Sequence, residues 1–170
     1  MRRYAALQTR STRRLADTHD ALQTRQKSSR HNSLVDGGSE SNVETVGRLH
    51  KRVRGAAKLD RSLEMLRYMS EYRPCPVVKT GFMVGLGETF DELVELMWQI
   101  YAAGVDIVTI GQYLRPSLAH LPVERFYHPD EFAELARIGH DIGLAHVEAG
   151  PLVRSSYKAF NQSRKLLEHG

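Results

Sequence analysis

The most unusual chemistry in this sequence lies in Arg154-Ser155-Ser156-Tyr157, which follows a glycine and a proline at 150 and 151. A deprotonated serine oxygen is a hard ligand that could bind a metal ion. Arg154 would offset negative charge nearby and lower the basicity of such an oxygen. The alternative is a serine that caps a helix, next to a surface arginine. Residue types alone favour the capping interpretation.

A second candidate is Gly85-Leu86-Gly87-Glu88, which follows an apolar run. Two glycines before a helix let backbone amides approach a ligand closely, and a helix N-terminus favours anions. The alternative is a tight turn in which Glu88 complements the helix dipole. Lys79, inside the same apolar run, either faces a ligand at the strand end or is an edge-exposed or ion-paired lysine. Both pairs of alternatives stay open at the level of sequence.

The other reactive side chains, the histidines and the cysteine, give weaker indications of function. The histidines lack the close spacing of metal ligands, so we expect them to be surface or capping residues: His120, His128, His140 and His146. The sequence holds a single cysteine, Cys75, which lies between two prolines and is expected to be an inert thiol. One cysteine excludes an internal disulfide framework and a self-contained four-cysteine metal site.

The elements that must position these residues alternate along the chain. Helical periodicity and capping residues predict helices over 60–72, 89–103 and 129–142, and short apolar runs predict strands over 77–84, 105–111 and 145–149. For the second helix, Thr89 is the expected N-cap and Glu92 completes a capping box. Such alternation predicts a parallel α/β sheet, in which functional residues gather at the carboxyl ends of the strands. So few strands make part of a barrel or a small open sheet.

Composition limits the class of protein. The 170 residues suffice for one domain, and the mean hydropathy of −0.42 indicates a soluble protein. We expect a weakly structured basic segment over 1–41, a body over 42–160 and a tail over 161–170. The excess of Lys and Arg lies in the first 40 residues, so nucleic-acid binding by the body is not expected. No apolar run of about 18 residues and no secretory signal is present, which predicts a cytoplasmic protein without a membrane span.

Several blocks resemble one family. The patterns are Asn42-x-Glu44-Thr45, Gly81-x-Met83-x-Gly85-x-x-Glu88, Gln112-Tyr113-Leu114-Arg115-Pro116-Ser117 and the Arg154–Tyr157 segment. In this order they resemble the C-terminal half of lipoyl synthase, a radical-SAM enzyme, over about residues 42–160. The resemblance implies a partial (β/α) barrel of the radical-SAM type, of which this chain would form the C-terminal half, with parallel strands and flanking helices.

The resemblance also implies roles for residues. It implies a wall that binds S-adenosylmethionine, formed by Asn42, Glu44, Lys79, Gly81, Gly85, Glu88 and Gln112. It implies that Ser156 ligates one iron of an auxiliary cluster, supported by Arg154, Ser155 and Tyr157. Ser41 stands where the family has a histidine, which puts the neighbouring Asn42 and Glu44 in question.

The implied reaction is the insertion of two sulfurs at C6 and C8 of a protein-bound octanoyl group. It would use two [4Fe–4S] clusters and S-adenosylmethionine. The implied partners are octanoylated lipoyl carrier domains or the glycine cleavage H protein, with flavodoxin or ferredoxin as electron donor. The two cysteine motifs that hold the clusters in the family have no counterpart here. We therefore expect no sulfur insertion from this chain alone.

Two other interpretations compete with this one. The chain could be a non-catalytic, truncated remnant of such an enzyme. It could also be a small β/α module that binds a phosphate at residues 85–87.

Overall fold

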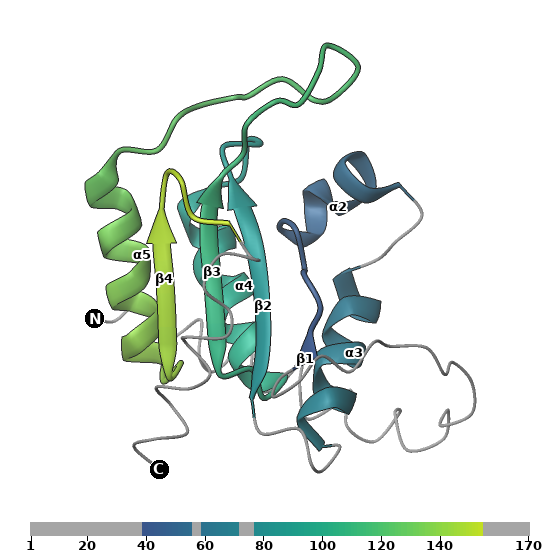
Figure 1. Ribbon diagram of the computed structural model, residues 1–170, viewed down its shortest axis with the longest axis vertical. Coiled ribbons are helices and arrows are strands. Elements are labelled where there is room, and N and C mark those ends of the chain that lie inside the picture. The colour runs from purple at the N-terminus through teal and green to yellow at the C-terminus, as the bar shows by residue number, and fades with distance from the viewer. Residues whose placement is uncertain (1–38, 56–58, 72–76, 155–170) are drawn as a thin grey trace. The chain divides into compact units, whose positions relative to one another are not determined.

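The described part of the chain is built on a parallel sheet. The computed structural model describes residues 39–55, 59–71 and 77–154. Strands β1 (Ser39–Glu40), β2 (Val78–Val84), β3 (Ile107–Gln112) and β4 (His146–Gly150) are hydrogen-bonded in this order, and all three pairings are parallel (Figure 1). Their carboxyl ends therefore meet at one edge of the sheet. The predicted α/β class with parallel strands and flanking helices is confirmed.

Helices connect and cover these strands. They are α2 (Gly47–Arg54), α3 (Leu59–Glu71), α4 (Phe90–Ala102) and α5 (Pro129–Ile142). Thr89 is the N-cap of α4, and the predicted capping box is present. The Thr89 side chain accepts from the Glu92 amide, and the Glu92 side chain accepts from the Thr89 amide. Helix α5 has the predicted bounds, with a left-handed Gly143 at its end. Helix α2 and strand β1 were not predicted.

The core lies between the sheet and the helices on one of its faces. Figure 1 shows α4 and α5 on the same face of the sheet, behind β3 and beside β4. Alternate residues of β2 and β3 point into this core, among them Val78, Phe82, Val84, Val108 and Ile110. The helices contribute apolar residues such as Leu93 and Met97 from α4 and Phe132 and Leu135 from α5. The residues between them, such as Gly81 and Met83, face the opposite side of the sheet.

Some boundaries differ from the sequence prediction. Helix α3 spans Leu59–Glu71 instead of the predicted 60–72, and Asp60 lies in its first turn. Strand β3 begins at Ile107, two residues later than predicted; just before it, the Asp106 carboxylate accepts the Val78 amide at 2.8 Å. No helix in the described ranges is long and apolar enough to cross a membrane. Most of the predicted basic segment and all of the tail lie outside the described residues.

Candidate functional site

A pocket of about 370 Å³ opens at the carboxyl edge of the sheet, on the face away from α4 and α5. Its lining comes from four chain segments: the stretch after β1, the ends of β2 and β3, and the turn after β4. The lining residues are Asn42, Glu44, Gly81, Phe82, Met83, Thr109, Gly111, Gln112, Leu114, Pro151, Leu152, Val153 and Arg154. Four of the seven predicted cofactor-binding residues are therefore brought together here: Asn42, Glu44, Gly81 and Gln112.

Glycines form the floor of this pocket. A Cβ on Gly81 would lie 2.5 Å from Thr109 Oγ1 and 3.2 Å from Asn42 Oδ1, closer than side chains tolerate. A Cβ on Gly111 would collide with the carbonyl oxygen of Val153, which crosses over β3 after the turn at the end of β4. The missing Cβ thus makes room for the Thr109 and Asn42 side chains at Gly81 and for the Val153 backbone at Gly111. This packing is the physical reason for glycine at these two positions.

The wall on the β1 side has an unusual backbone. Glu44 has a φ of 66°, the only positive φ of a non-glycine residue in the described ranges. It is the central residue of a three-residue turn closed by a 2.8 Å hydrogen bond from the Thr45 amide to the Val43 carbonyl. Such turns with positive φ are rare and strained. After the two-residue β1, the chain continues beside β2 and is joined to it by individual hydrogen bonds.

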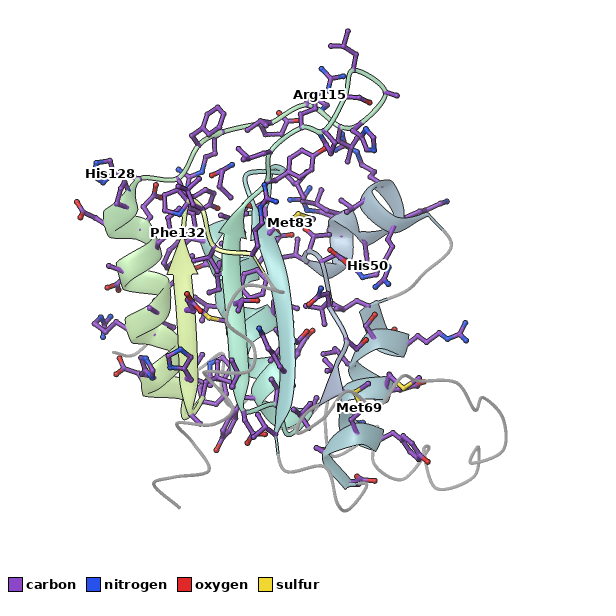
Figure 2. The ribbon with its side chains drawn as sticks, in the orientation of Figure 1. His50, Met69, Met83, Arg115, His128 and Phe132 are labelled. Atoms are coloured by element: carbon purple, nitrogen blue, oxygen red, sulfur yellow. The ribbon has the colours of Figure 1, made fainter. Side chains whose placement is uncertain are left out.

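Those hydrogen bonds fix the turn to β2. The amides of Val43 and Glu44 both donate to the Gly81 carbonyl at 3.1 Å, and the Met83 amide donates to the Glu44 carbonyl at 2.8 Å. Figure 2 shows Met83 at the upper, carboxyl end of β2. Glu44 therefore stands at the pocket wall with both of its backbone polar groups bound to β2.

Lys79 is buried in β2, with 4% of its surface exposed. It lies two residues before Gly81, so its side chain is on the same face of the sheet as the pocket floor. The edge-exposed alternative is wrong, because β2 is flanked on both sides by other strands. Lys79 does not reach the pocket lining, so its role toward a cofactor stays a prediction.

Gly85 and Glu88 are hydrogen-bonded to each other. The Glu88 carboxylate accepts the Gly85 amide at 2.6 Å and the Leu86 amide at 2.9 Å, and Glu88 is buried. Gly85 and Gly87 have φ of 100° and 99°. The tight-turn interpretation describes this geometry. Two of the amides that would have faced an anion are already bound to a carboxylate, so the turn gives no support to a phosphate module. Neither Gly85 nor Glu88 lines the pocket.

Gln112 has a structural task besides lining the pocket. Its Nε2 donates to the Arg125 carbonyl at 3.1 Å, and its Oε1 accepts the Tyr127 amide at 3.0 Å. These bonds hold the long connection between β3 and α5, which arches over the carboxyl edge in Figure 1; Figure 2 labels Arg115 on it. Its cofactor-binding role stays a prediction.

The same connection buries a tyrosine that the sequence did not single out. Tyr127 is 5% exposed, and its removal from water raises the pKa of Tyr127 to about 12. The Arg125 guanidinium carbon lies 3.7 Å from the centre of the Tyr127 ring. Arg125 also donates to Glu131 at 2.7 Å, at the start of α5. The pair closes the end of the connection onto that helix.

Several of the remaining predicted site residues lie outside the described part of the chain. Arg154 lines the pocket and is exposed. Ser155, Ser156, Tyr157 and Cys75 lie outside the described residues, so the predicted iron ligand stays a prediction. Within the described ranges, no group of three or more His, Cys, Asp or Glu side chains could hold a metal ion. The capping expectation for histidine is confirmed at His128, the N-cap of α5.

Comparison with known proteins gives the following relatives. The chain is 55% identical to the lipoyl synthase of Rubrobacter xylanophilus over 122 residues, covering 72% of this chain and 38% of that protein. It is 53% identical to the lipoyl synthase of Oceanobacillus iheyensis over 133 residues, covering 76% of this chain and 42% of that protein. It is 58% identical to the lipoyl synthase of Symbiobacterium thermophilum over 122 residues, covering 72% of this chain and 38% of that protein. The chain spans about two fifths of the length of these curated relatives. No family model matches it.

Proposed function

From the similarity to lipoyl synthases, which covers about two fifths of their length, we propose that this chain forms a cofactor-facing wall of a lipoyl synthase-like, radical-SAM partial barrel. The observation that carries the proposal is the pocket itself. Residues of three separate matching motifs, Asn42, Gly81 and Gln112, line one cavity at the carboxyl edge of parallel strands. That edge is where ligands bind in folds of this class.

The pocket suits part of S-adenosylmethionine. With a volume of about 370 Å³, the pocket is large enough to take a flat ring system. The carboxylate of Glu44 and the amide of Asn42 offer acceptors and donors for hydroxyl or ammonium groups. Apolar side chains of Met83 and Leu114 complete a mixed lining, as expected for a small-molecule site.

The described residues do not suit an iron–sulfur cluster. Such clusters need several thiolate ligands, whereas the sequence contains one cysteine and the described residues form no metal-binding group. We therefore propose that the chain binds S-adenosylmethionine without inserting sulfur by itself. Formation of lipoyl from octanoyl would require cysteines from outside these 170 residues. The family's partners, octanoylated carrier domains and a flavodoxin or ferredoxin, would act on that completed assembly.

Two measurements on the full chain test this proposal. Isothermal titration with S-adenosylmethionine should show saturable binding that weakens at least tenfold in Glu44→Ala, since a charged contact would be lost. Arg137→Gln, on the distant surface of α5, is the matched control and should bind like the parent. Absence of binding at millimolar ligand would refute the proposal.

Iron and labile sulfide should also be measured after anaerobic reconstitution. We expect near-zero iron, because a single thiolate does not hold a cluster. Stoichiometric [4Fe–4S] would contradict the expectation and show that copies of the chain combine their side chains into a cluster site.

A further inference from the structure

Three basic side chains of helix α2 contact backbone carbonyl oxygens, two of them in the segment that contains Glu44 and one in the turn after β2. Arg54 Nη1 donates to the Asn42 carbonyl at 3.0 Å, and His50 Nε2 lies 3.0 Å from the Val43 carbonyl oxygen. Arg48 Nη2 donates to the Gly87 carbonyl at 2.8 Å. One eight-residue helix thus binds the backbone on both sides of the strand end. Figure 2 shows His50 on this helix, beside the strand that ends near Met83.

His50 has a defined role in this set. Its ring is buried, with 2% of the residue exposed. Because a carbonyl oxygen can only accept, the ring nitrogen Nε2 must carry a proton and donate it. The carbonyl it binds, that of Val43, is the one that closes the three-residue turn around Glu44 through the Thr45 amide. His50 therefore binds the turn at its closing point.

Glu44 requires such support. A side chain at a φ of 66° is unfavourable, and an isolated segment would relax to negative φ. The peptide groups before Glu44 are held by Arg54 and His50, from α2. Its own amide and carbonyl are held by Gly81 and Met83, from β2. The strained residue is clamped between the two elements, as expected where backbone strain persists near a binding site.

Helix α2 is in turn fixed to α4. Arg48 Nε donates to Glu92 Oε1 at 2.8 Å and Arg48 Nη2 donates to Glu92 Oε2 at 3.0 Å, a two-pronged pair. The hydrogen bond from Arg48 lowers the pKa of Glu92 to about 2. The N-cap of α2, Val46, provides no side-chain hydrogen bond, and helices this short are marginal alone. The Arg48–Glu92 pair thus supplies an anchor that the helix end lacks.

We propose that His50 and Arg54 are positioning residues, which hold Glu44 in its left-handed conformation so that its carboxylate stands at the pocket. Arg48 keeps the helix that carries them in register with α4. The ligand in this inference, S-adenosylmethionine, comes from the proposed function. The conformational part is independent of it.

The test compares Arg54→Met with Arg52→Met in the full chain. Both arginines are exposed on α2, but only Arg54 donates to the wall. Hydrogen exchange in the ligand-free protein should be about tenfold faster at the amides of Glu44 and Met83 in Arg54→Met, and unchanged in Arg52→Met. Arg54→Lys, which keeps a donor, should restore part of the protection. Unchanged exchange in Arg54→Met would overturn the proposal.

A second pair of variants addresses His50. His50→Leu removes the donor and His50→Gln keeps an N–H group, so exchange at Glu44 should rise more in the first. If His50→Leu does not fold, the exposed Arg54 variants decide the outcome alone.

Titration with S-adenosylmethionine separates this inference from the proposed function. Affinity should fall about tenfold in Arg54→Met and stay at the parent value in Arg52→Met. If the parent does not bind, the proposed function fails, while the exchange data still confirm or overturn the positioning role. If the parent binds and Arg54→Met binds equally well, the positioning role is overturned.

Discussion

Two segments at the carboxyl edge of the sheet turn the chain with positive φ angles, but they differ in composition and in what satisfies them. The turn from β2 to α4 places glycine at both positions, Gly85 and Gly87. Its carboxylate, Glu88, bends back onto the turn's own amides. The turn after β1 instead places Glu44 at positive φ and receives its support from α2 and β2.

The difference separates a turn that satisfies its own polar groups from a turn that lines the pocket and is held by other elements. The glycine-rich turn looks like a phosphate-binding loop in sequence, yet two of its amides are occupied and it does not line the pocket. The turn at Glu44 has no such signature, yet it lines the pocket and carries the strain. Of these two turns, the strained one lies at the candidate site, and the glycine-rich one does not.

The largest expected effect comes from removing the carboxylate of the glycine-rich turn. Glu88→Ala would leave two amides without their acceptor in a buried position, and we expect a loss of about 3 kcal/mol in the free energy of unfolding. Urea denaturation followed by circular dichroism measures this loss. Glu95→Ala, exposed on α4, is the control. A loss below about 0.5 kcal/mol would mean that water replaces the carboxylate, and that the turn is open to ligands.

The next effect compares the two glycines of that turn. Their φ angles are nearly equal, so Gly85→Ala and Gly87→Ala share a strain of about 1–2 kcal/mol. The Cβ at Gly85 would also meet the Gln112 side-chain nitrogen and lie 2.6 Å from the Arg125 carbonyl oxygen, whereas at Gly87 the nearest atom is 3.4 Å away. We expect Gly85→Ala to cost about 1–3 kcal/mol more in unfolding experiments. Equal costs would show that the Gln112 contact yields easily.

A smaller effect concerns the ion pair between Arg48 and Glu92, which joins α2 to α4. Glu92→Gln removes the charge that Arg48 binds, and we expect about 1 kcal/mol of lost stability at pH 7, since the Glu92 side chain is 27% exposed and partly screened. The folded pKa of about 2 lies below the ordinary 4.5, so this contribution is present above pH 4.5 and is lost as the pH falls toward 2. Unfolding free energies of parent and variant should converge over that range. A difference independent of pH would argue against the ion pair as its cause.

The smallest effect on stability is expected at the strained position. Glu44→Gly relieves a positive φ but adds freedom to the unfolded chain, so the free energy of unfolding should stay equal or rise by up to about 1 kcal/mol. Glu44→Ala keeps the strain and should not gain. Both variants should lose affinity for S-adenosylmethionine. A clear loss of stability in Glu44→Gly relative to Glu44→Ala would show that the turn is not strained.

Sequence reasoning worked best where the determinants are local. The bounds of α5, the capping box of α4 and the course of β2 were predicted because caps, prolines and apolar runs act within a few residues. Of the predicted site residues, Asn42, Glu44, Gly81, Gln112 and Arg154 line the pocket, and here the resemblance to a family supplied what periodicity could not. Helix α2 escaped prediction because its N-cap offers no capping side chain and its support comes from Glu92, 44 positions along the chain from Arg48.

The sequence by itself determined the parallel α/β class, the order of its main helices and strands, and the lack of thiolates for a cluster. These follow from local propensities, hydrophobic periodicity and composition, each of which can be read along the chain. Only the tertiary structure decided which polar residues face the pocket. In the folded chain the Glu88 carboxylate accepts the amides of Gly85 and Leu86, and Gln112 binds the connection between β3 and α5. Glu44 is held at a positive φ. These choices depend on hydrogen-bond partners that lie apart in the sequence and meet only when the strands align.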